Sequence, residues 1–189
     1  SLETDATKQV SAVRSAEGEV LPLHAPLDAS VAVQQWLSEL ESSVVVTLAL
    51  GLQASTAHVP SYRTDKAALL AWISCTCSQL LLLGCQIQWS QSCEVAMCAI
   101  GTSSVDSGLQ ALVDDLTCRL RVLSACVAED ITTLLRRKAE QAVTECIHHR
   151  DVTKQLAVDG VSSPAHFQWQ YHLRYYFVPG GASSSPGQL

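Results

Sequence analysis

Apolar residues recur at steps of three and four along most of the chain, which is the spacing of one face of an α-helix. The first such segment predicts a helix over residues 30–52, with polar side chains on its opposite side. Pro60 interrupts the pattern, because the residue before a proline is disfavoured in the helical conformation. The predicted buried stripe of this helix contains Val33, Trp36, Leu37, Leu40, Val44, Leu48 and Gly51.

Two further periodic segments follow. The first predicts one helix over residues 64–100, and a polar loop at 101–108 separates it from the second. The second, over residues 109–156, predicts either one long helix or two helices with a joint near residues 128–130. Gly160 ends this pattern, because glycine adopts the left-handed conformation that closes many helices.

The first 25 residues lack helical spacing and predict a β-hairpin. Strands at 9–13 and 20–23 flank a polar turn that ends at Gly18, a residue able to adopt a positive φ. Pro22 and Pro26 favour a short second strand at the edge of the sheet, because proline cannot donate a hydrogen bond to a neighbouring strand.

Together these elements predict a mainly α fold, in which long antiparallel helices form a bundle behind a small N-terminal β-hairpin. The predicted parts are a hairpin lead-in at 1–25, a helical segment at 26–178 and a disordered Gly/Ser/Pro-rich tail at 179–189.

Composition narrows the possible functions. Apolar residues make up 48% of the 189 residues and charged residues only 16%, which is typical of a folded domain. The net charge of −6 argues against a nucleic-acid partner, because phosphate binding requires a basic surface. The leucine run at 80–83 is too short to span a membrane, and the first eight residues lack the apolar core of a signal peptide. We therefore expect a reducing compartment, in which most of the eight cysteines are small buried hydrophobic residues.

Possible reactive groups are few. Cys75 and Cys77 would point some 200° apart on a continuous helix, since each residue turns about 100°, so core packing is favoured over zinc binding. Cys146, His148 and His149 lie close together beside Glu145 and could form a thiolate–imidazole pair or a metal site. Consecutive histidines on a helix face different ways, so at most one approaches Cys146, and no second cluster completes a ligand set. No lysine follows the glycine pattern of a phosphate-binding loop. The sequence predicts a non-enzyme without catalytic, metal-ligating or cofactor-binding residues, and a Cys146/His148 enzyme is the least favoured alternative.

The end of the helical segment has an unusual composition. Residues 167–177 contain six of the ten Phe, Trp and Tyr residues of the chain, together with Arg174. Such a segment either closes the core of the domain or forms an interface, since aromatic residues and arginine concentrate at interface centres.

Residues 167–177 read F-x-W-x-x-x-L-R-Y-Y-F, which resembles the F-x-W-x-x-Q-L-R-x-Y-W that closes the linker of dynein heavy chains. Four upstream segments resemble linker motifs of the same family, in the same order. They are Ser15–Val20 (S-x-E-G-E), Val33–Leu37 (V-E-x-W-L), Trp72–Trp89 (W-V-x-x-x-P-x-Q…Q-I-x-W) and Ile147–Val152 (V-H-x-R-D-V).

The chain departs from the family pattern at three positions. Cys77 stands where the family usually has proline, His172 where it has glutamine, and Phe177 where it often has tryptophan.

The resemblance implies a mechanical function. A dynein linker is a helical lever across the AAA+ ring, so this segment would be non-catalytic and would couple ATP turnover to microtubule-based movement. The resemblance implies two sets of residues. The junction with the first AAA+ module would be formed by Phe167, Trp169, Leu173, Arg174, Tyr175, Tyr176 and Phe177. The structural signature would be Trp36, Trp72, Gln79, Trp89, His148, Arg150 and Asp151, of which the last three would hold helices together.

The resemblance also implies the surroundings of the segment. ATP and Mg would be bound by the AAA+ ring and not by this segment. The partners would be that ring, intermediate or light chains through the parent protein, and the microtubule only indirectly, with neither nucleic acid nor membrane. The location would be the cytoplasmic cytoskeleton, with the axoneme of a cilium or flagellum as a further possibility. The alternative is a stand-alone helical protein-interaction module derived from a linker but without motor activity.

Overall fold

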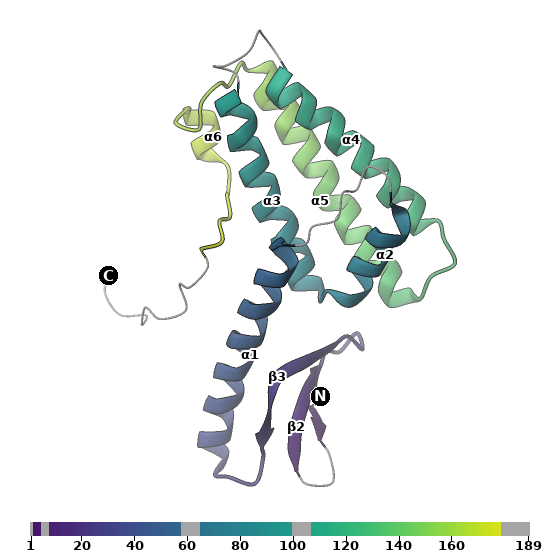
Figure 1. Cartoon of the computed structure of the whole chain (residues 1–189), viewed down its shortest axis with the longest axis vertical. Helices are drawn as coiled ribbons and strands as arrows, with labels where there is room; N and C mark the ends of the chain where they lie inside the picture. The colour runs from purple at the N-terminus through teal and green to yellow at the C-terminus, as the bar shows by residue number, and fades with distance from the viewer. Residues whose placement is uncertain (1, 5–7, 58–64, 100–106, 179–189) are drawn as a thin grey trace. The chain divides into compact units, whose positions relative to one another are not determined.

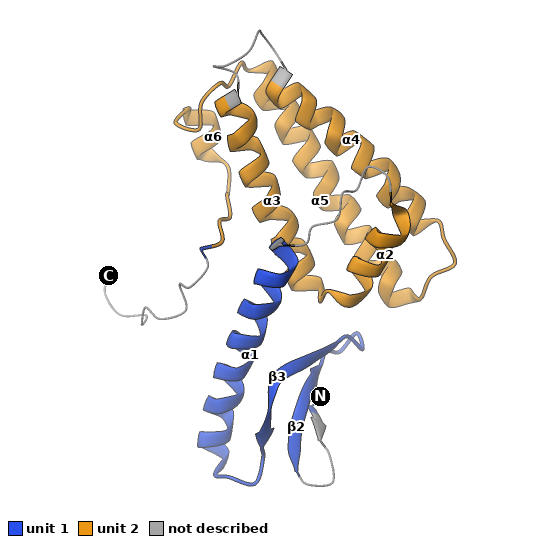
Figure 2. Cartoon of the chain, viewed as in Figure 1, with its two compact units in different colours: residues 1–57, 178–189 blue, residues 58–177 orange. Residues whose placement is uncertain are grey.

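A computed structural model of the chain describes residues 2–4, 8–57, 65–99 and 107–178. The predicted tail at 179–189 lies outside the described residues, as does most of the predicted loop at 101–108. The fold is mainly helical with a small N-terminal β-sheet (Figure 1), which confirms the predicted fold class. The chain divides into two compact units (Figure 2): Ser1–Ala57 with Val178–Leu189, here unit 1, and His58–Phe177, here unit 2.

The sheet of unit 1 contains strands β1 (Leu2–Thr4), β2 (Gln9–Arg14) and β3 (Val20–Asp28), paired antiparallel in that order. The turn between β2 and β3 is the predicted one, and Gly18 adopts a φ of 87°. Strand β3 lies at the edge of the described sheet, as predicted, but the prediction that it is short was wrong, since it has nine residues. Its edge position explains this length, because prolines are tolerated on a strand with one unpaired side.

Helix α1 (Val33–Ala57) packs against β3 within unit 1. The predicted boundary between residues 25 and 26 falls inside β3, and the strand and the helix belong to one unit. The predicted buried stripe was wrong at Val33 and Leu37, which are exposed. The buried positions of α1 are instead Ser43, Thr47 and Ser55.

The predicted helix over 64–100 is two helices, α2 (Lys66–Cys75) and α3 (Ser78–Ala99). The single-helix prediction was wrong because Thr76 is extended, with φ −94° and ψ 131°. Two interactions define this break. The Thr76 N–H still donates to Trp72 O at 3.0 Å, while the Thr76 carbonyl accepts from Lys138 Nζ at 2.9 Å. The Asp65 carboxylate caps α2 by accepting from Ala68 N at 2.9 Å.

The last long periodic segment forms α4 (Ser107–Val127) and α5 (Thr133–Val158), so the two-helix alternative is confirmed. Thr132 caps α5 through its side chain, and Arg136 Nη2 donates to Glu129 O in the connection at 3.0 Å. Gly160, at φ 68°, follows the end of α5 as predicted. In Figure 1, α3, α5 and α4 lie side by side, and α4 runs antiparallel to both α3 and α5.

The short helix α6 (Phe167–Tyr171) is followed by residues 172–178, which have no regular secondary structure. Trp169 of α6 belongs to the core of unit 2, which also draws residues from α2, α3, α4 and α5. The largest fully buried side chains of this core are Trp169, Leu69, Ile73, Leu81, Met97 and Leu156.

Candidate functional site: an aromatic cluster and the terminal segment

Three rings from three helices meet in the interior of unit 2. The Trp89 ring on α3 stacks on the His149 ring of α5, with centroids 4.5 Å apart and planes 2° from parallel. The Trp169 ring of α6 meets Trp89 edge-on at 5.4 Å and 65°. Both geometries are among the favourable arrangements of aromatic pairs. We call Trp89, His149 and Trp169 the aromatic cluster, and it ties residues far apart in the sequence into one contact.

Hydrogen bonds fix the rings of the cluster. Trp89 Nε1 donates to Thr153 Oγ1 at 3.0 Å, and the Thr153 hydroxyl donates to His149 O, one turn earlier on α5, at 2.6 Å. Cys93 Sγ lies 3.8 Å from the same hydroxyl oxygen. The buried indole N–H therefore has a partner, which avoids the penalty of about 1–3 kcal/mol for an unsatisfied buried polar group.

The environment of His149 keeps its imidazole neutral. Its pKa is lowered from 6.5 to about 3, mainly by burial and in smaller part by electrostatic repulsion from His148 and Arg119. Glu145 Oε2 lies 3.5 Å from His149 Nε2 and would favour the charged form. Desolvation outweighs this single contact, because the ring is only 4% exposed and is covered by Trp89. His149 therefore packs as an aromatic ring and carries no charge at neutral pH.

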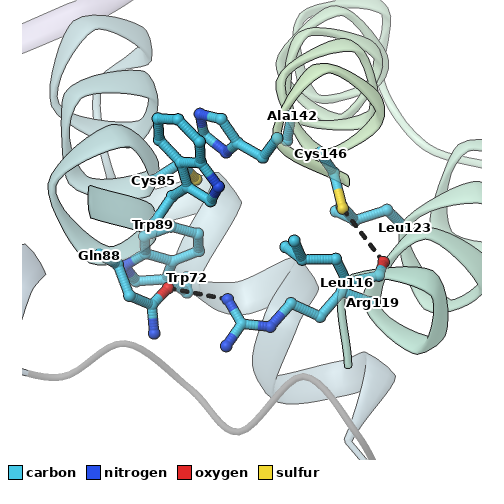
Figure 3. Close-up of a pocket in the computed structure, with 10 residues that line it drawn as sticks. Trp72, Cys85, Gln88, Trp89, Leu116, Arg119, Leu123, Ala142 and Cys146 are labelled. Carbon is cyan, nitrogen blue, oxygen red and sulfur yellow. Dashed lines mark hydrogen bonds between the residues drawn. The ribbon is translucent and has the colours of Figure 1, made fainter. Parts of the chain in front are cut away.

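A small opening beside the cluster is lined by residues of α2, α3, α4 and α5, including Trp72, Cys146 and Arg119 (Figure 3). Arg119 donates to Gln88 Oε1 at 3.0 Å across the opening and pairs with Asp115 at 2.8 Å. Cys146 Sγ donates to Leu116 O at 3.4 Å. Arg119, Gln88 and Cys146 at this opening are thus each hydrogen-bonded within the protein.

The alternative of an enzyme with a Cys146/His148 pair is contradicted. Burial raises the pKa of Cys146 to about 11, so its thiol is protonated at neutral pH. The histidine that lines the opening with Cys146 is His149, whereas His148 is exposed. A protonated thiol beside a neutral imidazole is not the thiolate–imidazolium pair of a cysteine nucleophile.

The cysteines differ from the prediction. Three of the eight are buried, namely Cys93, Cys126 and Cys146, so the expectation that most would be buried was wrong. Cys75 is exposed, so core packing does not describe it. Among the described residues, no group of three or more His, Cys, Asp or Glu side chains could hold a metal ion. The absence of a cofactor stays a prediction.

The terminal segment, residues 167–177, is anchored to α3 along one side. Trp169 is 0% exposed, and its Nε1 lies 3.5 Å from Glu94 Oε1. The Tyr176 hydroxyl donates to the same oxygen at 2.5 Å, and the backbone N–H of Tyr175 donates to Ser90 Oγ at 3.2 Å. Arg174 lies 5.9 Å from the centre of the Trp169 ring and donates to Gln170 Oε1 at 2.9 Å. The first half of the segment is thus held by burial and the second half by hydrogen bonds.

The other side of the terminal segment is exposed. Phe167 is 77% exposed, Tyr171 81% and Leu173 73%. Phe167 and Tyr171 face each other at 6.3 Å on α6. The remaining predicted junction residues, Tyr175 and Phe177, are half-buried. The seven predicted junction residues therefore divide between those that bind the helices and those that present apolar surface.

The predicted signature residues do not form one group. Trp72 is buried on α2 and Trp89 lies in the aromatic cluster, whereas Gln79 is exposed near the start of α3. Trp36 is half-buried on α1 in unit 1, and its ring N–H has no hydrogen-bond partner.

The predicted role of His148, Arg150 and Asp151 differs from their contacts. Arg150 Nη2 pairs with Asp151 Oδ1 at 2.8 Å, so this ion pair lies within α5 and does not join two helices. His148 is exposed, and the neighbouring His149 makes the contact between helices.

Sequence reasoning missed Thr153, Ser90 and Glu94, and it considered His149 only as a neighbour of Cys146. His149 and Thr153 lie four residues apart on α5, and so do Ser90 and Glu94 on α3. This spacing places two side chains on the same face of a helix. This spacing was the available signal in the sequence. It became a site only through the contacts of the α5 pair with Trp89 and of the α3 pair with the terminal segment, which the sequence does not show.

The fold and the cluster define a helical domain built around buried aromatic rings. Among the described helices, none is long and apolar enough to cross a membrane. No protein-family model matches the chain.

Comparison with known proteins identifies relatives. The chain is 33% identical over 178 residues to the cytoplasmic dynein heavy chain of Neurospora crassa, an alignment covering 91% of this chain and 4% of that protein. It is 30% identical over 172 residues to the cytoplasmic dynein heavy chain of Drosophila melanogaster, covering 88% and 4%. Mouse dynein axonemal heavy chain 5 is 27% identical over 173 residues, covering 89% and 4%. This chain is therefore homologous to one short segment of the dynein heavy chains.

Proposed function

We propose that this chain is the carboxy-terminal part of a dynein linker and that it acts as a non-catalytic lever, coupling ATP turnover in an AAA+ ring to movement along a microtubule. The observation that carries the proposal is the two-sided terminal segment. Trp169 is fully buried among the helices, while Phe167, Tyr171 and Leu173 are exposed. A segment that is fixed on one side and apolar on the other is suited to join a lever to a second body.

The helical unit has the stiffness that a lever needs. Helices α3, α4 and α5 each span at least 21 residues and pack along one another. At a rise of about 1.5 Å per residue, the three helices extend over about 30–40 Å. Close packing lets such a bundle transmit a displacement at one end as a movement of the whole unit.

The terminal segment would supply the joint with the first AAA+ module. Phe167, Tyr171 and Leu173 would contact that module, and Trp169, Tyr175 and Tyr176 would hold the segment on the helices. ATP and Mg would be bound by the ring, and the microtubule would be reached only through other parts of the parent. The relatives are cytoplasmic and axonemal dyneins by name, so we propose a cytoskeletal location for this chain as well.

A chimeric motor tests the proposal. The matching segment of the Neurospora crassa cytoplasmic dynein motor would be replaced by residues 10–177 of this chain, and ATPase rate and microtubule gliding velocity would be measured. We expect ATP turnover with measurable gliding. A chimera carrying an unrelated helical bundle of similar length is the control, and we expect it to hydrolyse ATP without gliding. Gliding no faster than this control in a chimera that retains ATPase activity contradicts the lever function.

The stand-alone interaction module uses the same exposed residues, and no separate observation favours it. The chimera distinguishes the two functions, because an interaction module has no reason to support gliding.

A further inference from the structure

The second half of the terminal segment, residues 172–177, has neither regular secondary structure nor a fully buried residue. Leu173 and Tyr176 are exposed and Tyr175 and Phe177 only half-buried, so burial of apolar area holds this stretch incompletely. Such a stretch would behave as a flexible linker unless specific contacts fix it. Its contacts with α3 therefore decide whether the joint is rigid.

Two side chains of α3 make these contacts. Ser90 and Glu94 lie four residues apart and so share one face of the helix. Ser90 is fully buried, and its hydroxyl donates to Gln86 O at 2.9 Å, which leaves its oxygen free to accept from Tyr175 N at 3.2 Å. One residue along, the Tyr176 hydroxyl donates to Glu94 Oε1 at 2.5 Å. The two hydrogen bonds hold consecutive residues of the segment, one by backbone and one by side chain.

Glu94 also links this contact to the aromatic cluster. Its Oε1 lies 3.5 Å from Trp169 Nε1 and so faces donors from both halves of the terminal segment. Hydrogen bonds to an ionised acceptor are stronger than those between neutral groups. Burial, together with hydrogen bonding to Glu94, raises the pKa of Tyr176, so its hydroxyl keeps the proton that it donates.

We propose that Ser90 and Glu94 are positioning residues that clamp residues 172–176 onto α3, so that the terminal segment is a rigid extension of the bundle. The mechanical meaning of this clamp rests on the proposed lever function, whereas its existence does not. Glu94 is the central residue of the clamp, because it is the acceptor shared by Tyr176 and Trp169. The clamp leaves the exposed side of the segment free for the second body.

Amide hydrogen exchange of the full chain tests the clamp. Tyr176→Phe removes only the hydroxyl that donates to Glu94, and Glu94→Ala removes the acceptor. In both variants we expect the Tyr175 amide to exchange about tenfold faster or more, because losing a hydrogen bond to a charged group has an effect of that order. Amides of α4 and α5 are expected to keep their protection. Glu94→Gln retains an acceptor and is expected to fall between wild type and Glu94→Ala.

Two control variants match these changes. Tyr171→Phe removes a hydroxyl from an exposed ring of the same segment, and Gln91→Ala truncates an exposed side chain on α3. Neither is expected to change the exchange of Tyr175. The clamp is overturned if Tyr176→Phe and Glu94→Ala leave Tyr175 exchange within about twofold of wild type. It is equally overturned if Tyr176→Phe weakens protection uniformly over α3, α4 and α5, since the residue would then act on overall stability.

The chimeric motor separates this inference from the proposed function. With a functional lever, Tyr176→Phe is expected to keep the ATPase rate and lower the gliding velocity, while Gln91→Ala keeps both. Unchanged gliding in the Tyr176→Phe chimera contradicts a mechanical role for the clamp. A chimera without any gliding contradicts the lever function, and hydrogen exchange on the chain still decides whether the clamp exists.

Discussion

The two compact units of the chain bury different kinds of side chain. In unit 2 the interior is a continuous set of apolar residues from five helices, with Trp169, Leu69 and Ile73 fully buried. Among the described residues of unit 1 the buried apolar side chains are Val10 and Ala12, and the buried face of α1 carries hydroxyl groups instead. Buried apolar area contributes about 25 cal/mol per Å², whereas a typical hydrogen bond contributes about 1 kcal/mol net. Unit 2 should therefore resist local opening better than unit 1.

Hydrogen bonds replace apolar packing between β3 and α1. The backbone N–H of His24 donates to Thr47 Oγ1 at 3.0 Å, and its ring Nδ1 lies 3.3 Å from the hydroxyls of both Ser43 and Thr47. Meanwhile α1 leaves several large apolar residues exposed. These are Val33, Leu37, Val45, Val46 and Leu50.

The largest expected effect tests the core of unit 2. Trp169→Ala removes a fully buried ring that contacts Trp89, and we expect the free energy of unfolding to fall by about 3–5 kcal/mol. Urea denaturation monitored by circular dichroism would measure it. Phe167→Ala, two residues away on an exposed ring, is the control and is expected to change stability by about 0.5 kcal/mol or less. Equal effects of the two variants would contradict the assignment of Trp169 as the anchor.

The second prediction concerns acid sensitivity of the aromatic cluster. The pKa of His149 is lowered from 6.5 to about 3 in the folded chain, so the unfolded state binds the proton more readily. The stability associated with a neutral His149 is complete above pH 6.5 and is lost as the pH falls toward 3. Between pH 7 and pH 5 we expect a loss of about 2 kcal/mol, since each pH unit below the unfolded pKa contributes about 1.4 kcal/mol.

Denaturation curves measured across this pH range would check the prediction. His149→Phe keeps a ring against Trp89 but removes the titrating group. Its loss of stability between pH 7 and pH 5 should therefore be smaller than that of wild type by about 2 kcal/mol. An identical pH dependence in wild type and His149→Phe would show that the imidazole is not held neutral.

The third prediction concerns the polar interface of unit 1. Thr47→Val keeps the shape of the side chain but deprives the His24 N–H of its acceptor, so we expect a loss of about 1–3 kcal/mol. Hydrogen exchange of the His24 amide would measure it. Thr56→Val is the matched control, because the Thr56 hydroxyl donates to carbonyls of its own helix. If the two variants behave alike, the hydroxyl face of α1 does not stabilise its packing on β3.

The smallest expected effect concerns the break between α2 and α3. The dynein linker pattern has proline where this chain has Cys77, and Thr76 already has the extended backbone that a following proline requires. We expect Cys77→Pro to stabilise the chain by about 0.4–1 kcal/mol through the reduced freedom of the unfolded state. Cys75→Pro, in the last turn of α2, is the contrast and is expected to destabilise by about 3 kcal/mol. Thermal unfolding compares the two, and destabilisation by Cys77→Pro would contradict the inferred match to a proline position.

The sequence alone indicated the mainly helical fold, the turn at Gly18 and the end of α5 at Gly160, because spacing and backbone preference are local properties. It also identified the dynein resemblance and pointed to the aromatic residues at 167–177. The break at Thr76 escaped prediction, because Cys77 gives no sign of a helix break as a proline would, and the contact from Lys138 comes from 62 positions away.

Tertiary structure decided which residues within these patterns are buried and which partners they contact. Adjacent histidines at 148 and 149 are chemically identical, but only His149 lies against Trp89 and becomes buried and neutral. Likewise, the aromatic residues at 167–177 do not reveal which of them is the anchor. Burial and partners depend on helices that are distant in the chain, so the separation of Trp169 from Phe167, and the pairing of Tyr176 with Glu94, followed only from the packing of the fold.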